Sequence, residues 1–569
     1  MIIYLSDRCE LPKNNPWDPS IVNFLHPKYE QSNCILKPRL TELLNGQLVD
    51  VSNETTECNY RCLYVKGEKG FRTDPWTTMA KNLTYNVTCD FVETQCSVDS
   101  HIFYRYIHIQ VLKSKTKHFQ AEDKLNPSIL MVIHDSTSLG SGIRTLVRSN
   151  EFLPDRRYYG DITMRRFFTI ITRLVSTVGQ MLTLCLQVGL NENETVTYDF
   201  IRKKYATFVA DEWCCAFTWP NCYGYKNPQF DHYAAPLIGR VETKKVAAEF
   251  AKSFFDNDCQ SKYHKIIEYS EKFVKTYDGV AKFVVVWFSF AHNDLNSLYP
   301  ADKYFADFFE NNIEQLKGSF IFWMADHGLR FGGPRQTKAG FIEDNNPFLA
   351  IAVPEYLRSN AQLLLNMRRN SKRHTSQYDI FATLYDIANV AGRKNFNDWS
   401  FHDFRDDLGL VRGGTRARSL FRPILYDRTC QEMFIPMDHC ICLNSWRNLP
   451  NDSKEVIHIA EVLVKYINDE VRNATPTGSC ALLKFQKVDK AEIFEEHSIT
   501  RIAVIASPSY GKYQAIVKDK GDGDLEVVST ISRLDSYGNQ GQCQKGEKIR
   551  PLCYCTNTNL TNSKKLIQK

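Results

Sequence analysis

The sequence predicts an α/β protein with a mainly parallel central sheet covered by helices on both faces. Between residues 126 and about 400, short apolar runs alternate with amphipathic segments, the order expected of βαβ units. The runs are apolar at successive positions rather than at alternate ones, which is typical of strands buried on both faces. We therefore predict a core over residues 126–429, between a cysteine-rich N-terminal region (1–125) and a cysteine-rich C-terminal region (430–569).

The core elements follow from residue spacing. Apolar runs predict strands at 128–133, 205–210, 283–290 and 319–324, with a fifth at 348–353. Apolar residues three and four positions apart predict helices over 261–277, 302–316 and 378–391.

The two flanking regions carry weaker patterns. Residues 105–112 read as a strand that closes the N-terminal region, and 113–126 as a connection to the core. In the C-terminal region we expect an α+β arrangement with a helix over 453–470 and strands at 501–507, 513–518 and 525–531. Residues 519–524 are rich in Asp and Gly and predict a hairpin between the last two strands.

The cysteines favour disulfide bonds. The chain has 18 of them, many clustered towards the ends. The Cys-x-Cys and Cys-x3-Cys pairs could bind zinc, but no further cysteine or histidine lies at ligand spacing. The spacings do not fix which cysteines pair.

Seven Asn-x-Ser/Thr sequons, each a candidate glycosylation site, point to the same environment. They begin at Asn53, Asn82, Asn86, Asn193, Asn451, Asn473 and Asn559. Together with the cysteines they predict an extracellular protein or one in the secretory-pathway lumen. The first residues lack the apolar stretch of a signal peptide, and no run has the roughly 20 apolar residues of a transmembrane segment.

The charge pattern argues against nucleic acid as a partner. The formal net charge is +6, from 71 basic and 65 acidic residues spread along the chain. No basic stripe is interleaved with aromatic residues, as a nucleic-acid surface would require.

Polar residues that can bind metal follow four of the predicted strands. Because parallel strands end at one edge of a sheet, these side chains are expected to gather there. Carboxylate and imidazole groups suit zinc or manganese. The alternative is that each Asp only caps a helix or forms a turn. The residues are Asp135, Asp211, His292, Asp294, Asp326 and His327.

An Asp after the first core strand and Asp326-His327-Gly328 after a later one resemble the alkaline-phosphatase superfamily, which includes sulfatases and phosphoethanolamine transferases. A closer resemblance is to the family called domain of unknown function 229 (DUF229), from about Cys9 to Cys555. It is carried by the segments 231–233, 292–296, 326–332, 340–349, 419–421, 428–442 and 531–555.

The resemblance implies an alkaline-phosphatase-like core and a set of site residues. Asp135, Asp326 and His327 would bind a divalent metal (zinc, manganese or calcium). A second metal or the substrate would be held by Asp211, His292, Asp294 and His374, of which His374 lies among basic residues typical of a surface. The nucleophile would be Thr183, with Thr177 and Thr137 as alternatives.

The chain departs from the family pattern where the nucleophile is expected. Leu182 occupies the position at which the family has the nucleophilic hydroxyl, and Thr183 lies one residue later. Leu139 stands where the family tends to have Arg, and Asn293 where it has Asp. Three hypotheses follow. One is a metal-dependent hydrolase or transferase of phosphate or sulfate esters of glycans, lipids or small molecules. Another is a secreted pseudoenzyme that binds a ligand or partner, with or without a metal. The third is a cysteine-rich structural protein without an ancestral site, against which the retained Asp-His-Gly argues.

Overall fold

The computed structural model describes residues 11–12, 15–28, 34–67, 70–152, 168–170, 195–213, 229–292, 294–404, 407, 417–425, 428, 430, 432–433, 435, 439–441, 446–475, 478–494, 498–521, 523–544 and 549–556. Contacts divide the chain into two units. One comprises residues 14–329 and 346–427, and the other 1–13, 330–345 and 428–569. The predicted three-region boundaries remain a prediction.

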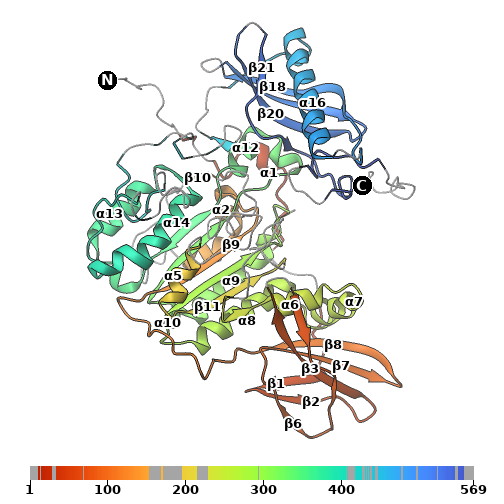
Figure 1. The fold of residues 1–569 in the computed structure, drawn as a ribbon. Coiled ribbons are helices and arrows are strands. Elements are labelled where there is room, and N and C mark those ends of the chain that lie inside the picture. Colours follow the sequence, from red (N-terminus) through yellow and green to blue (C-terminus); the bar gives the residue numbers. More distant parts are fainter. Residues whose placement is uncertain are drawn as a thin grey trace. The chain divides into compact units, whose positions relative to one another are not determined.

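The first unit contains the predicted central sheet (Figure 1). Its strands lie in the order β12 (His232–Tyr233), β11 (Ala206–Asp211), β13 (Lys282–Phe288), β9 (Ser128–His134), β14 (Ser319–Ala325) and β15 (Leu349–Ala352). The first five are parallel, as predicted. The edge strand β15 is antiparallel, because Leu349 pairs with Met324 near the end of β14 and the chain then runs back.

Helices cover both faces of this sheet, which confirms the predicted α/β class. Alternate residues such as Val132 and Trp323 pack with α8 (Lys262–Thr276) and α9 (Leu298–Asn311). Their neighbours, such as Met131, pack with α13 (Ala361–Asn370) and α14 (Gln377–Tyr385).

Two predicted helices are divided in the structure. The helix predicted over 302–316 is α9, which ends at Asn311, followed by α10 (Ile313–Leu316). The helix predicted over 378–391 is α14, followed by a π-helical turn, Asp386–Val390. The other elements around this sheet are α1 (Pro19–Val22), α2 (Leu139–Thr145), α3 (Val147–Phe152), α5 (Thr197–Arg202), α6 (Ala235–Val241), α7 (Ala247–Ala251), η2 (Lys252–Asn257), η3 (Glu355–Leu357), η5 (Ala391–Lys394), and the parallel pair β10 (Phe168–Ile170) and β16 (His374–Ser376).

The cysteine-rich N-terminal region forms two antiparallel sheets. One contains β4 (Gly70–Thr73), β3 (Glu57–Lys66), β7 (Phe91–Val98), β8 (His101–Ile109) and β5 (Thr77–Thr78), and the other β1 (Thr41–Leu44), β2 (Gln47–Asp50) and β6 (Thr84–Asn86). Their buried residues share one hydrophobic core with α8 and α9. Disulfide Cys58–Cys96 joins β3 to β7, and Cys62–Cys89 joins β3 to the chain two residues before β7. Cys34–Cys259 reaches the chain two residues after η2.

A buried carboxylate fastens the larger sheet to α6. Glu93 of β7 is fully buried. It forms ion pairs with Arg61, Arg105 and Arg240, at 2.7, 3.4 and 2.8 Å. Three cations around one carboxylate compensate the cost of burying it.

The second unit carries the predicted α+β arrangement. Helix α16 (Lys454–Ala474) lies against an antiparallel sheet of β17 (Arg447–Asn448), β18 (Lys484–Phe494), β19 (Ile499–Ser507), β20 (Gly511–Asp519), β21 (Leu525–Val527) and β22 (Ser532–Arg533). β20 and β21 form the predicted hairpin, although β21 ends at Val527. The unit also contains α11 (Gly332–Arg335) and α12 (Lys338–Asp344).

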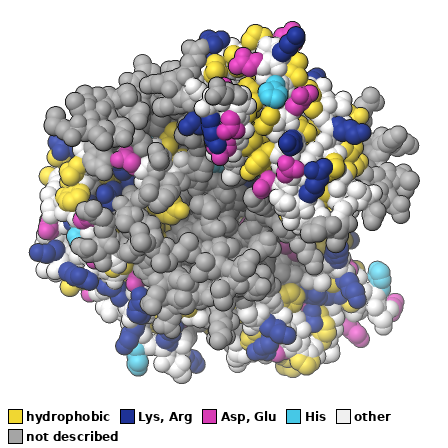
Figure 2. Space-filling view, turned by 45° about the horizontal axis from the view of Figure 1, so that its top comes forward, with side chains coloured by type: hydrophobic (Ala, Val, Ile, Leu, Met, Phe, Trp, Pro, Cys, Tyr) yellow, Lys and Arg dark blue, Asp and Glu magenta, His cyan; other side chains and the backbone are white. Residues whose placement is uncertain are grey.

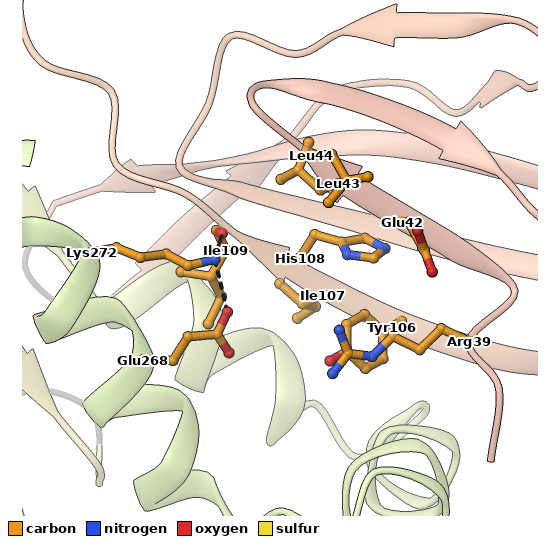
Figure 3. Close-up of a pocket in the computed structure, with 10 residues that line it drawn as sticks. All are labelled: Arg39, Glu42, Leu43, Leu44, Tyr106, Ile107, His108, Ile109, Glu268 and Lys272. Carbon is orange, nitrogen blue, oxygen red and sulfur yellow. Dashed lines mark hydrogen bonds and ion pairs between the residues drawn. The ribbon is translucent and has the colours of Figure 1, made fainter. Parts of the chain in front are cut away.

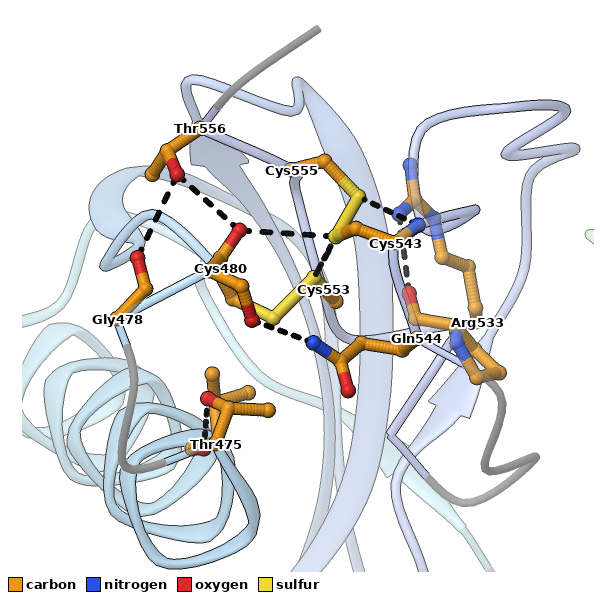
Figure 4. The surroundings of a disulfide bond; sticks show 12 residues. Thr475, Gly478, Cys480, Arg533, Cys543, Gln544, Cys553, Cys555 and Thr556 are labelled. Carbon is orange, nitrogen blue, oxygen red and sulfur yellow. Dashed lines mark hydrogen bonds between the residues drawn. A yellow bond between two sulfur atoms is a disulfide. The ribbon is translucent and has the colours of Figure 1, made fainter.

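Cysteines of the second unit pair as disulfides: Cys430–Cys440, Cys480–Cys553 and Cys543–Cys555. In Figure 4 the last two lie side by side, and the amide N of Cys543 donates to Sγ of Cys555 at 3.1 Å. The expected preference for disulfides over zinc is confirmed for the described cysteines.

The described surface mixes charges. On the face shown in Figure 2, basic and acidic side chains of the described residues lie interspersed. Among the helices that the structure describes, none combines the length and apolar character needed to cross a membrane.

Candidate metal centre

The central sheet brings three of the predicted ligands together. Asp135 follows β9, and Asp326 and His327 follow β14. These strands are parallel neighbours in which His134 pairs with Ala325, so both chains leave the sheet at the same point. All three side chains are buried, and one ligand atom from each lies within 4.8 Å of the others.

The histidine presents Nε2 to both carboxylates. Nε2 of His327 lies 3.6 Å from Oδ1 of Asp135 and 3.5 Å from Oδ2 of Asp326. Nδ1 of His327 lies 2.6 Å from the carbonyl oxygen of Gly328. A carbonyl oxygen can only accept, so Nδ1 carries the proton and donates it there. In the neutral ring, Nε2 therefore has its lone pair directed at the two carboxylates.

This donor set fits a divalent cation. Two buried carboxylates and an imidazole lone pair that face one another repel unless a cation or a proton lies between them. Carboxylate oxygens with one imidazole nitrogen suit zinc or manganese, whereas calcium prefers a shell of six to eight oxygens. Of the three metals expected, calcium fits this set least well.

A residue that the sequence analysis did not single out contacts all three predicted ligands. The amide N of Ser136 donates to Oδ1 of Asp326 at 3.0 Å. Its hydroxyl donates to Oδ1 of Asp135 at 2.9 Å and lies 3.4 Å from Nδ1 of His327. Ser136 has a φ of 60°, in the left-handed region. Its place next to Asp135 is the only sign that the sequence offers.

Hydrogen bonds fix the backbone of the two aspartates in the cluster. The amide N of Asp135 donates to the carbonyl oxygen of Phe288 in β13 at 2.8 Å. Nε2 of Gln377, at the start of α14, donates to the carbonyl oxygen of Asp326 at 3.2 Å. Both strand ends are therefore anchored to neighbouring elements.

The other predicted ligands do not join this cluster. Among the described residues, no metal-binding group contains Asp211, His292, Asp294 or His374. Asp211 accepts a hydrogen bond from the amide N of Trp213 at 2.9 Å, and exposed Asp294 accepts one from Asn296 at 2.9 Å. Both interactions are those of turns.

The two histidines of that set lie in different surroundings. The ring of His292 meets that of Trp213 edge to face, with centroids 5.7 Å apart. His374 is 2 % exposed in β16. The surface position that its basic neighbours suggested is therefore wrong, because strand pairing with β10 places this residue inside.

Next to Asp211, the buried side chain of Glu212 links the end of β11 to the residues that follow β13. It accepts hydrogen bonds from the amides of Ser289 and Phe290, at 2.8 and 2.9 Å. Burial raises the pKa of Glu212. At the end of β11, Glu212 is thus buried and Asp211 is half-buried, and a role of Asp211 in holding a second metal or the substrate stays a prediction.

Of the predicted nucleophiles, only Thr137 lies within the described residues; Thr177 and Thr183 lie outside them. The Thr137 hydroxyl donates to the carbonyl oxygen of Asp135 at 3.4 Å.

Five sequon asparagines are exposed on the described surface: Asn53, Asn82, Asn86, Asn451 and Asn473. Nδ2 of Asn451, the atom that would carry a glycan, donates to the carbonyl oxygen of Asp489 at 3.0 Å. Asn193 and Asn559 lie outside the described residues. Glycosylation remains a prediction.

A separate pocket, shown in Figure 3, lies between β1, β8 and α8. Its volume is about 210 Å³, and its lining includes Arg39, Glu42, His108, Glu268 and Lys272. Lys272 and Glu268, one turn apart on α8, form an ion pair at 2.9 Å on one wall of it. None of the predicted site residues lines this pocket.

Comparison with known proteins identifies a family. A family model described as "Protein of unknown function (DUF229)" matches residues 25–489. No curated protein matches the chain.

Solved structures give looser matches. The lipoteichoic acid synthase LtaP from Listeria monocytogenes is 13% identical, with coverage of 49% of this chain and 76% of that one and a TM-score of 0.33. The C-terminal periplasmic domain of EcEptC from Escherichia coli is 12% identical, with 56% and 90% covered and a TM-score of 0.33. The phosphonate monoester hydrolase SpPMH from Silicibacter pomeroyi is 10% identical, with 71% and 91% covered and a TM-score of 0.36.

Proposed function

We propose a function from the premise that this chain belongs to the DUF229 family of proteins of unknown function. The proposed function is that of a divalent-metal-dependent hydrolase or transferase of phosphate or sulfate esters. The observation that carries the proposal is the cluster of Asp135, Asp326 and His327, with ligand atoms within 4.8 Å of one another at the ends of two adjacent parallel strands. The resemblance of Asp326-His327-Gly328 to the alkaline-phosphatase superfamily supplies the reaction class.

In this proposal the three ligands have distinct roles. The carboxylates of Asp135 and Asp326 bring two negative charges to a buried site, and His327 adds a neutral nitrogen whose tautomer is set by Gly328. The metal, when bound, neutralises charge on the transferring group and activates an oxygen nucleophile. Thr183 is the first candidate for that nucleophile and Thr177 the next, because the described hydroxyl of Thr137 contacts a backbone carbonyl.

We place the protein in the extracellular space or the secretory-pathway lumen. Support comes from six disulfides among the described cysteines. Such bonds persist in oxidising compartments and are rare where thiols are kept reduced. The substrate would then be an ester of an extracellular glycan, a lipid or a small molecule.

The first test is the metal content of the full chain purified from a secretory host. Elemental analysis should find zinc or manganese in stoichiometric amount in the wild type and little in Asp326→Asn or His327→Gln. His264→Gln is the matched control, since His264 is another buried histidine, with Nδ1 accepting from the amide N of Ser261. A wild type without metal, or a control that loses metal equally, would refute the site.

One observation favours a second function, that of a binding protein without turnover. Leu182 stands at the position where the family pattern has the nucleophilic hydroxyl. If metal-loaded protein cleaves neither p-nitrophenyl phosphate nor p-nitrophenyl sulfate but binds inorganic phosphate or sulfate, this second function replaces the first. Turnover that Asp326→Asn abolishes would establish the first.

A further inference from the structure

Ser136 occupies a backbone conformation that its residue type disfavours. Its φ is 60°. For an L-residue that carries a side chain, this backbone angle has a higher free energy than it has for glycine. Such strain persists only where the surroundings enforce it, and it clusters at functional sites. Ser136 is also buried, with 6% of its surface exposed.

The neighbouring backbone enforces this conformation. Before it, Asp135 is held to β13 through the carbonyl oxygen of Phe288. After it, the carbonyl oxygen of Thr137 accepts from the amide N of Phe348 at 3.0 Å, and the amide N of Leu139 donates to the carbonyl oxygen of Asn346 at 2.8 Å. The turn is thus fixed on both sides of Ser136.

The result of the left-handed turn is that one residue contacts all three ligands. Its amide N donates a hydrogen bond to Oδ1 of Asp326. The same oxygen accepts a second hydrogen bond from the amide N of His327, at 2.7 Å. Its hydroxyl has one proton, which is donated to Asp135. Its oxygen lone pair then accepts a share of the Nδ1 proton of His327, alongside Gly328.

We infer that Ser136 is a positioning residue that assembles the metal site before metal arrives, an inference that rests on the proposed function. Ser136 orients Asp135 and the ring of His327 through its hydroxyl, and Asp326 through its amide. Partners that orient metal ligands in this way typically change metal affinity by about 10- to 100-fold when they are removed.

The test compares two variants that both lack the hydroxyl. Ser136→Ala keeps a Cβ in the left-handed turn, whereas Ser136→Gly removes the strain as well. We expect both to weaken binding of Mn²⁺ and of Zn²⁺ alone, measured by calorimetry on the metal-free full chain, by about 10- to 100-fold. We expect the Tm of metal-free Ser136→Gly to exceed that of Ser136→Ala.

The control is Ser128→Ala at the other end of β9, where the buried hydroxyl accepts from the amide N of Lys282 at 2.9 Å. It should lower the Tm and leave metal affinity unchanged. If the wild type binds metal and both Ser136 variants bind it equally well, or if affinity merely follows Tm across the three variants, the inference is overturned and the proposed function stands. If the wild type binds neither metal, the proposed function fails and the inference with it.

Discussion

Nε1 of Trp323 donates a hydrogen bond to Nε2 of His134 at 2.8 Å, joining β14 to β9 one residue before Asp135. Both side chains are fully buried. Burial lowers the pKa of His134 from 6.5 to about 3. The ring is therefore neutral at physiological pH, and its tautomer leaves Nε2 free to accept from Trp323.

Acid should destabilise the fold through this histidine. Its folded pKa lies below its unfolded one, so the unfolded chain binds the extra proton as pH falls from about 6.5 towards about 3. The stabilisation is fully present above pH 6.5 and should be lost through this window at about 1.4 kcal/mol per pH unit. Chemical denaturation at several pH values should show a shallower loss for His134→Gln. His101→Gln, at an exposed position in β8, should leave the profile unchanged.

Removal of the Trp323 indole should lower the free energy of unfolding. Trp323→Phe deletes the donor to His134 and leaves space in a packed core, so we expect a loss of about 2–4 kcal/mol in the free energy of unfolding. A double-mutant cycle with His134→Gln measures the coupling between the two residues. Strict additivity in that cycle would show that the hydrogen bond contributes nothing.

The charge of Glu93 should be essential to the N-terminal sheet. Glu93→Gln keeps the side-chain volume but leaves Arg61, Arg105 and Arg240 close together without their shared carboxylate. We expect a loss of about 3–5 kcal/mol in the free energy of unfolding, measured by denaturant titration. Glu57→Gln, on the exposed side of β3, is the control and should change little. An equal effect of the two substitutions would contradict the role of the buried cluster.

Packing of the helix after the site leaves no room for a methyl group at Gly142. A Cβ there would lie 2.3 Å from Cδ2 of Phe348. Gly142→Ala should therefore destabilise the protein by about 1–3 kcal/mol, and Phe348→Leu should relieve part of the clash. In Gly392→Ala the nearest atom to the new Cβ is 3.7 Å away, so that control should be close to neutral. Thermal unfolding of Gly142→Ala, Phe348→Leu, the double variant and Gly392→Ala measures these differences in stability.

Much of the site could be predicted because parallel strands end together. The apolar runs before Asp135 and Asp326 define adjacent buried strands, and that topology alone brings the two carboxylates to one edge. The role of Ser136 depends on a left-handed backbone angle, which residue patterns do not reveal.

Local composition misled at one position and left another open. The basic residues around His374 suggest a surface, but strand pairing buries this residue. At the end of β11, residue type does not distinguish Asp211 from Glu212, and only the structure shows that Glu212 is the one bonded to the amides after β13.

The bond between Cys34 and Cys259 closes a loop across 225 residues. A protease that cuts one peptide bond anywhere between these cysteines would therefore separate no fragment, because the two pieces would stay joined through sulfur. Such a nick would be invisible on a non-reducing gel and would appear as two bands after reduction. Processing within that stretch would thus alter the chain's continuity without shedding its N-terminal sheets.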